Sequence, residues 1–436
     1  MSKELSLKTI DTFAKKYGKE TQVEVLNAAM AKTELADLAF VPMNAAKLRG
    51  DFSLEIKTRG ITAQEKSGRC WMFAALNIMR EMIAEKCNLK EFELSANYIT
   101  FFDKLEKANN FLESIILYAN EDVNSQAMLY TLDGVSDGGF WGMAVDLIKK
   151  YGIVPKSVQP ESYQSNHTDK FLKLINHLLK KDAMELRAMV KAGKDPRKRK
   201  EEMLYEIYRA ECIAFGEPVK SFHFEYRDKE EKFHSIRNIT PKEFYDRFIG
   251  MELDEYVAVI NEPTANKPLN TPITFHSTAN MAEKNMYALN LSMKDLESLC
   301  IKQLKGGEPV WFACDVLSYS ARKEGVLDPD SFRYEELLGG VDFYMPKKER
   351  LELRSSAANH AMLLCGVNFD EKKQPERWKI ENSWGKDVGE NGYYVASEKY
   401  FQEFVYEAVI HKKYMTKTQL GYLKKKPVEI AGWEEE

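Results

Sequence analysis

One cysteine of this chain stands at a position suited to nucleophilic chemistry. Cys70 opens the segment CWMFAALNIMREMIAEK, whose first two turns are apolar on nearly every side, which is typical of a buried helix. A thiol at the first turn of a helix lies near the positive end of the helix dipole, and we expect this position to lower the thiol pKa. We also expect Ser67 to cap this helix and Gly68 to allow close backbone approach. An isolated cysteine is more often an ordinary core residue, so a catalytic interpretation depends on partner groups.

Residues that would complete a nucleophilic site occur at two other places in the chain. Gln64, six residues before Cys70, carries an amide that can donate to an oxyanion together with the Cys70 backbone N–H. Among the seven histidines, His360 is the one that directly precedes an apolar strand, AMLLCGVNF. Asn382 ends the next predicted strand, so the intervening loop would bring it to the histidine, with Trp384 shielding their hydrogen bond from water. Because a cysteine nucleophile needs a base and the base needs an orienting group, the sequence predicts a Cys70–His360–Asn382 triad.

The elements that must position this triad follow an α+β order of helices, inserted helices and then sheet. The predicted strands of the last part span residues 309–316, 361–369, 377–384 and 392–397. The predicted domains are an N-terminal covering arm (1–60), a helical lobe with the nucleophile helix (61–165), a helical insertion (166–300), a β-rich lobe with the histidine and asparagine (301–415) and a C-terminal tail (416–436). An oligomerisation role for the insertion and a place near the cleft for the tail are implied only by the family resemblance described below.

Local signals fix several boundaries within this order. Ser95 predicts the start of a second helix, and Thr240 with Pro241 and Glu243 predicts a capping box at another. The glycine-rich residues 133–142 predict a loop. The basic run at 194–200 suits either phosphate contacts or a solvated turn between two helices, and the turn is the commoner occurrence.

The composition excludes some classes of protein. The chain has 436 residues, 63 Lys and Arg against 67 Asp and Glu, and 44% hydrophobic residues, which is typical of a folded protein without a bias toward nucleic acid. Its six cysteines form no CxxC pair, so they predict neither a zinc site nor a disulfide framework, and reduced thiols in a cytosol fit best. No signal peptide and no membrane span is expected.

The residues around the predicted triad resemble the papain-type cysteine peptidases. The nucleophile signature of that family, Cys-Gly-Ser/Ala-Cys-Trp/Tyr, corresponds to SGRCW here, and its Asn-Ser-Trp-Gly box is present as residues 382–385. The resemblance implies a two-lobed fold with a helical lobe and a β-barrel-like lobe. Ser67 replaces the signature's first cysteine, which secreted members tie into a disulfide. Cys70 and His360 lie 290 positions apart, against about 130 to 150 in the family, so a large insertion is implied.

A narrower resemblance, to the bleomycin hydrolase and bacterial aminopeptidase C branch, runs along nearly the whole chain. It is carried by QEKSGRCWMFAALN, FELSANYITFFDKLEKANNFLE, YGIVPKSVQPES, EYRDKEEKFHSIRNITPKEFY, GGEPVWFACDV, NHAMLLCGV, WKIENSWGKDVGENGYY and YFQEFVYEAV. This resemblance implies Cys70 as nucleophile and His360 as its base and acid, with a covalent acyl-enzyme. Asn382 would orient the histidine, and Gln64 would donate to the oxyanion. The substrate-binding positions that we expect from it are Gly138, Gly139, Phe140, Asn359 and Trp384.

The same resemblance carries expectations about assembly and surroundings. It implies a homohexamer whose active sites face an internal channel, oligopeptide substrates, a cytoplasmic location, and neither a cofactor nor a metal. Phe140 replaces the glutamine of that branch, so the adjacent subsite is expected to be more apolar.

The C-terminal tail bears on which peptide bonds are cleaved. In exopeptidase members of the branch the tail lies in the cleft and resembles Trp-Asp-Pro-Met-Gly-Ala-Leu-Ala, and its carboxylate pairs with the free amino group of the substrate. Here the tail reads PVEIAGWEEE, with Trp433 in the place of that tryptophan and Glu436 last. The final small apolar residues of that pattern are missing, so we expect the terminal carboxylate not to reach the subsite next to Cys70, which predicts an endopeptidase. An aminopeptidase is the alternative if the terminal glutamates still attract a substrate ammonium. A nucleic-acid-binding or scaffold role is a third reading, which the negative net charge and the filled catalytic positions disfavour.

Overall fold

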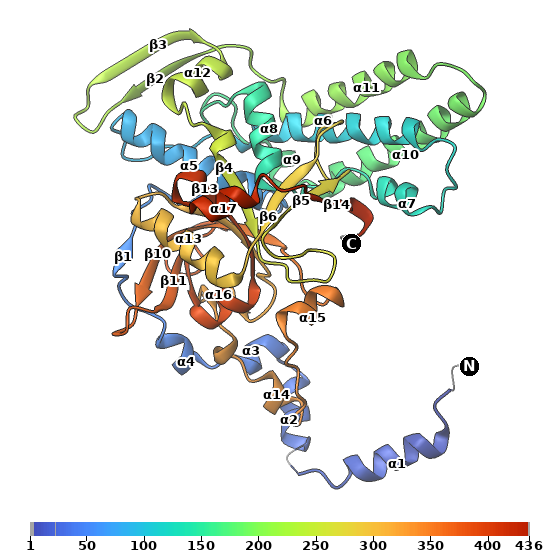
Figure 1. The fold of residues 1–436 in the computed structure, drawn as a ribbon, viewed down its shortest axis with the longest axis vertical. Helices are drawn as coiled ribbons and strands as arrows, with labels where there is room; N and C mark the ends of the chain where they lie inside the picture. The colour runs from blue at the N-terminus through green and yellow to red at the C-terminus, as the bar shows by residue number, and fades with distance from the viewer. Residues whose placement is uncertain (1–3, 22, 435–436) are drawn as a thin grey trace.

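The helices between Cys70 and Phe248 gather at one end of the molecule, and the large sheet lies beside them (Figure 1). The structure is a computed structural model and describes residues 4–21 and 23–434. The helices of the helical part are α5 (Cys70–Lys86), α6 (Ala96–Leu117), α7 (Gln126–Asp133), α8 (Trp141–Tyr151), α9 (Tyr163–Asn166), α10 (Asp169–Lys191), α11 (Arg197–Phe215) and α12 (Pro241–Phe248).

Several of these helices begin as the sequence predicts. The Ser95 hydroxyl accepts from the Tyr98 N–H and caps α6, and Thr240 and Glu243 form the predicted capping box of α12. The first eleven residues of α5 are all buried, as its apolar pattern predicts. The predicted cap of α5 is wrong, because the Ser67 hydroxyl donates to the Gln64 carbonyl instead and the cap position is Arg69.

The inserted segment is less helical than the sequence predicts. Helices α10 and α11 pack on α6 around an apolar cluster. The basic run pairs within the chain, since Arg197 and Lys200 contact Glu113, while Arg199 contacts Glu185. Beyond α11 the chain forms the hairpin β2 (Phe222–Arg227) and β3 (Phe233–Ile239), and then three strands that enter the large sheet. The alternating residues 221–228 predict β2, whereas the three strands that enter the large sheet escaped prediction, and the first of them pairs with β13 almost 150 positions later in the chain.

The large sheet carries the second half of the site. Its order is β14-β5-β6-β4-β13-β7-β10-β11-β12-β9-β8, with β1 paired to β10, and in the described residues these pairs follow an open path. The strands are β1 (Leu54–Glu55), β4 (Tyr256–Ile260), β5 (Thr271–His276), β6 (Met286–Asn290), β7 (Val310–Cys314), β8 (Ser320–Ala321), β9 (Val326–Leu327), β10 (His360–Phe369), β11 (Pro375–Glu381), β12 (Tyr393–Ser397), β13 (Val405–His411) and β14 (Val428–Ala431).

The two faces of this sheet bury different helices. Side chains alternate between faces along a strand, so Ala313 and Ala361 face the cluster that contains α5, while Phe312 and Met362 face the opposite cluster. The helices that accompany the sheet are α13 (Met293–Lys305), α14 (Tyr334–Leu337), α15 (Lys347–Glu352), α16 (Glu398–Phe404) and α17 (Lys417–Tyr422). Because α5 packs directly on β7 and β10, the sheet and the nucleophile helix share one core.

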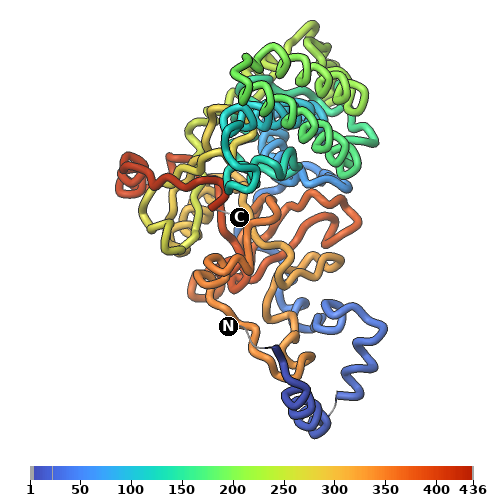
Figure 2. Tube along the Cα trace, turned by 90° about the vertical axis from the view of Figure 1, so that its right-hand side faces the viewer, coloured from blue at the N-terminus to red at the C-terminus, as the bar shows by residue number. Residues whose placement is uncertain are grey.

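The N-terminal helices form as predicted, but the first of them covers nothing. They are α1 (Leu7–Tyr17), α2 (Val23–Met30), α3 (Leu35–Ala39) and α4 (Pro42–Ala46). Only Ala39 and Ala45 of these helices are buried, in a small cluster with residues of β8, β9 and β12. Helix α1 projects from the body in both views (Figures 1 and 2), and its apolar Leu7 is 83% exposed. The expectation of a covering arm is therefore wrong for α1 within this chain.

In the parts of the chain that the structure describes, no helix combines the length and apolar character that crossing a membrane requires.

Candidate active site

The predicted nucleophile lies where α5 meets the sheet. Cys70 is the first residue of α5, and its Sγ accepts a hydrogen bond from the backbone N–H of Ala361 on β10 at 3.4 Å. His360 precedes Ala361 and faces Cys314 of β7 in register. The packing of helix on sheet thus brings Cys70 next to a residue 290 positions later in the chain.

The predicted base and orienting residue are joined directly. Strands β10 and β11 pair antiparallel, and the His360 Nε2 lies 2.8 Å from the Asn382 Oδ1. Since Nε2 is engaged with Asn382, Nδ1 is the ring nitrogen left for proton exchange with the Cys70 thiol. Trp384 stacks on the His360 ring with centroids 4.6 Å apart, as the sequence predicts, and the Arg322 guanidinium lies 4.2 Å from the Trp384 ring centroid.

Gln64 reaches the site through backbone pairing with the residues after Asn382. The Gln64 N–H donates to the Ser383 carbonyl at 2.8 Å, and the Gly385 N–H donates to the Thr62 carbonyl at 3.1 Å. The Gln64 Oε1 accepts from the Ser383 hydroxyl at 2.7 Å, and its Nε2 donates to the Ser67 carbonyl at 2.6 Å. An amide nitrogen carries two N–H groups, so one remains for an oxyanion.

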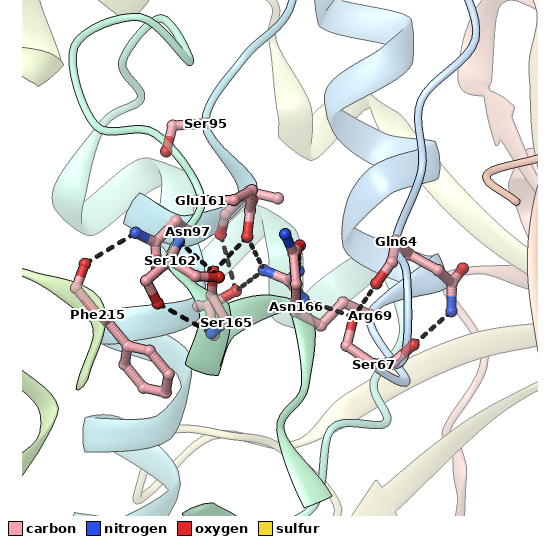
Figure 3. A network of polar contacts seen from close by, with 12 residues as sticks. Gln64, Ser67, Arg69, Ser95, Asn97, Glu161, Ser162, Ser165, Asn166 and Phe215 are labelled. Atoms are coloured by element: carbon pink, nitrogen blue, oxygen red, sulfur yellow. Dashed lines mark hydrogen bonds and ion pairs between the residues drawn. The ribbon is translucent and has the colours of Figure 1, made fainter. Parts of the chain in front are cut away.

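The loop before the nucleophile is held by a buried arginine (Figure 3). The Arg69 side chain is fully buried, forms an ion pair with Glu161 at 3.0 Å and donates to the Ser67 hydroxyl at 2.8 Å. It also donates to the Thr100 hydroxyl of α6. These contacts tie the loop to α6 and to the segment around α9, so the position of Cys70 is fixed before substrate arrives.

A second network holds the same loop from the other side. The Asp137 carboxylate accepts from the Gly68 N–H at 3.0 Å and from the Thr168 hydroxyl, and it pairs with the buried Lys104 ammonium at 2.9 Å. Burial by itself raises the pKa of Asp137, but Lys104 and the hydrogen bonds outweigh it and hold that pKa below its usual range. A Cβ on Gly68 would lie 2.9 Å from the Asp137 side chain, so the close approach predicted there is observed.

Burial, rather than the helix dipole, dominates the titration of the catalytic pair. Cys70 is 9% exposed, and burial raises the pKa of its thiol even though backbone N–H groups, that of Ala361 first, act to lower it. Burial also lowers the pKa of His360 to about 4. The expectation of a lowered thiol pKa is therefore not met. Burial therefore disfavours a lone charge on either group.

A cavity of about 660 Å³ opens beside Cys70 and His360. The predicted residues Gly138, Gly139 and Phe140 all line it. The Lys107 ammonium donates to the Gly138 carbonyl at 2.6 Å, which fixes the glycine segment. A Cβ on Gly139 would lie within 2.8 Å of the Trp71 ring, so only glycine fits at this point.

The remaining predicted positions lie around the same centre. Asn359 lines the cavity, but its side chain is engaged with Asp315 and the Val316 N–H, so it fixes the start of β10. Trp384 lines a separate shallow pocket on the other side of the nucleophile loop, together with Arg322. Trp433 lines the main cavity, and Glu436 lies outside the described residues.

Sequence reasoning missed two residues of this region. The Ser383 hydroxyl donates to the Gln64 side chain and orients it. The signal in the sequence was a hydroxyl residue inside the Asn-Ser-Trp-Gly box. Glu407 lies in the cavity wall on β13, and its signal was a charged residue within the apolar run VYEAVI.

Comparisons with known proteins agree with this geometry. The chain matches the Peptidase C1-like family over residues 4–435. It is 42% identical to aminopeptidase C from Listeria innocua and 38% identical to aminopeptidase C from Lactobacillus helveticus, with 100% of this chain and 98% of each relative covered. The crystal structure of PepW from Lactobacillus rhamnosis HN001 matches with a TM-score of 0.96 and 39% identity, over 100% of this chain and 99% of that one. The resemblance to bacterial aminopeptidase C is confirmed.

Proposed function

We propose that this chain, which belongs to the Peptidase C1-like family, acts on oligopeptides as an aminopeptidase. Its membership makes it a papain-like cysteine peptidase, as the sequence predicts. Relatives named aminopeptidase C or aminopeptidase G match over 100% of this chain at 38 to 42% identity. These names support the aminopeptidase, which was the alternative prediction, better than the endopeptidase.

The observation that carries the proposal is the position of the tail. After β14 pairs with β5, Gly432 and Trp433 line the cavity that also contains Cys70 and His360. The Trp433 ring packs against Tyr130 of α7 with centroids 6.3 Å apart. A wall made by the chain's own tail limits how much peptide fits beside the nucleophile, which favours removal of residues from a peptide end.

The proposed chemistry uses the groups gathered around Cys70. His360 takes the thiol proton of Cys70 at Nδ1 as Sγ attacks the scissile carbonyl. The oxyanion is held by the Cys70 backbone N–H and the free N–H of Gln64. His360, kept in orientation by Asn382, gives its proton to the leaving amine. The rest of the peptide leaves with that amine, and the histidine then activates a water that hydrolyses the thioester and releases the amino-terminal residue.

A second candidate, the endopeptidase, has one observation in its favour. The cavity volume of about 660 Å³ exceeds what a single amino-acid residue fills. Peptide on both sides of the scissile bond would use that space.

One experiment separates the two activities. A ten-residue peptide is offered with a free and with an acetylated amino terminus under reducing conditions, and products are identified by mass spectrometry. Stepwise loss of single residues from the free form alone supports the aminopeptidase. Internal cleavage of both forms overturns it in favour of the endopeptidase.

We further propose a homohexamer in the cytoplasm. Helix α1 supports an assembly, because its apolar Leu7, Ile10 and Phe13 are exposed and a partner chain would bury them. The six cysteines are all unpaired, which suits a reducing compartment. Native mass spectrometry tests the assembly, and a monomer at micromolar concentration would contradict it.

A further inference from the structure

One carboxylate faces the catalytic cavity from the strand next to β7. Glu407 of β13 lies in register with Ala313 of β7, and Ala313 lies in register with Ala361 of β10, whose N–H contacts the Cys70 sulfur. Residues in register share a face of the sheet, and Glu407 lines the cavity with both alanines. Two strand spacings, about 10 Å, separate Glu407 from Ala361.

This carboxylate has no partner in the part of the chain that the structure describes. Glu407 is 6% exposed, and its side chain makes neither a hydrogen bond nor an ion pair there. Its register neighbours are the uncharged Ala313 and Ile260. Burial raises the pKa of Glu407 to about 8, and the nearby Glu262 carboxylate adds to the effect. A buried carboxylate without a partner costs folding free energy, so a ligand is the natural source of compensation.

Two other charged residues of the cavity lining have partners within the chain. Glu262 forms an ion pair with Lys267. Lys107 pairs with Asp103 at 3.1 Å and donates to two backbone carbonyls. Asp133, a further acidic residue of the lining, is exposed to solvent. Glu407 is therefore the buried carboxyl group without a partner among the described cavity residues, and a cation would stabilise its ionised form.

We propose that Glu407 forms the base of a subsite that binds a positively charged group, ammonium or guanidinium, on the amino-terminal portion of the substrate. Such a pair gains a charge-assisted hydrogen bond in a site shielded from water. Ala258 and Ala313, whose side chains are small, line the same cavity as Glu407. The proposal rests on the peptidase activity of the site, but not on whether the cleavage is terminal or internal.

Two sources supply such a cation. One is the α-ammonium of the peptide, and the other is the side chain of a lysine or arginine near the scissile bond. An extended peptide advances about 3.5 Å per residue, so a carboxylate at the distance of Glu407 lies beyond the first residue's backbone. A long cationic side chain would span the remaining distance between the peptide backbone and the Glu407 carboxylate.

The test compares substrates that differ by one charge. The first pair is leucine coumarin amide with a free and with an acetylated amino group. The second pair is the acetylated dipeptides Arg-Leu and citrulline-Leu as coumarin amides, in which citrulline is the neutral counterpart of arginine. For each pair the ratio of kcat/KM is measured for the wild type and Glu407→Gln at pH 8. Where a peptide is not cleaved, its inhibition constant against a cleaved substrate replaces kcat/KM.

The expected result is a loss of at least tenfold in the charged-to-neutral ratio for one pair or both in Glu407→Gln. The pair that responds identifies the source of the cation. Ratios unchanged within twofold for both pairs overturn the proposal. A failure of the aminopeptidase proposal is seen separately, as cleavage of the acetylated ten-residue peptide, and leaves these ratios measurable.

A matched control exists elsewhere in the chain. Burial also raises the pKa of Glu398 to about 8, but this carboxylate lies on α16 and accepts from Trp378 and Gln402. Glu398→Gln makes the same chemical change away from the cavity and is expected to leave both ratios unchanged. Equal losses in Glu398→Gln and Glu407→Gln would also overturn the subsite. Alkylation of Cys70 by iodoacetamide at the wild-type rate verifies that each variant is folded around the nucleophile.

Discussion

The nucleophile loop and the far wall of the cavity differ in how their polar side chains are satisfied. Around the loop, Arg69, Gln64 and Asp137 all have hydrogen-bond or ion-pair partners supplied by the chain. At the wall, Glu407 is equally buried and has none among the described residues. The loop is complete without substrate, whereas the wall holds a buried carboxyl group whose ionised form a cationic ligand would stabilise.

This difference separates two tasks of one cleft. A catalytic centre works best when its donors are already oriented, because no reorganisation is then needed during the reaction. A binding subsite gains affinity from a group that is unsatisfied before the ligand arrives, at a cost in stability. The predictions below test whether the loop and the wall behave in these two ways.

The largest effect is expected at the nucleophile. Cys70→Ala removes the sulfur that attacks the carbonyl, so kcat/KM is expected to fall by about 10⁴-fold or more. Since Cys70 is small and lies at the start of α5, the fold should be retained. Hydrolysis of a peptide coumarin amide gives the rate, and thermal unfolding gives the control. A variant with full activity would refute the assigned nucleophile.

At the wall, the buried Glu407 is expected to make the free energy of unfolding depend on pH. The pKa of Glu407 is raised to about 8 in the folded chain, so the folded state keeps a proton that the unfolded state loses above its ordinary pKa near 4.5. Stability therefore falls as the pH rises between these values, by about 1.4 kcal/mol per unit and at most about 5 kcal/mol. Glu262 is the charged group acting on Glu407, and its own pair with Lys267 remains in the variant.

Glu407→Gln removes this titration and is expected to be more stable than the wild type at pH 9. At pH 5, where Glu407 is protonated in the folded chain, the two proteins should have nearly equal stability. Urea unfolding at the two pH values measures the difference. A variant less stable than the wild type at pH 9 would mean that the carboxylate already has a partner, and the contrast between wall and loop would be lost.

At the loop, the oxyanion donor should matter for rate and little for affinity. Gln64→Ala removes one of two donors and is expected to lower kcat by about 10²- to 10³-fold with a small change in KM. Steady-state kinetics on one peptide substrate gives both constants. A rise in KM with unchanged kcat would instead make Gln64 a ground-state binding residue.

The sequence predicted the loop better than the wall, for a physical reason. His360 and Asn382 belong to the β10–β11 hairpin, so they are close in the chain as well as in space, and Cys70 was found through its own local motif and the family resemblance. The place of Glu407 in the cavity wall depends on its pairing with Ile260, almost 150 positions away. It also depends on strands β4 to β6, which were predicted to be part of a helical insertion. The pKa of Cys70 was misjudged similarly, because its burial depends on the sheet that packs over α5.

The smallest effect is expected at Ser383, which acts through Gln64 and touches no substrate. Its hydroxyl donates to the Gln64 Oε1 at 2.7 Å and thereby fixes which way the amide nitrogen points. Ser383→Ala removes one neutral hydrogen bond, worth about 1 kcal/mol, so kcat is expected to fall about fivefold. In the Gln64→Ala background the same substitution should have no further effect on kcat, because there is no amide left to orient. Additive losses in the double variant would show that Ser383 acts on the site by another route, and the loop would then be less tightly interlocked than its hydrogen bonds indicate.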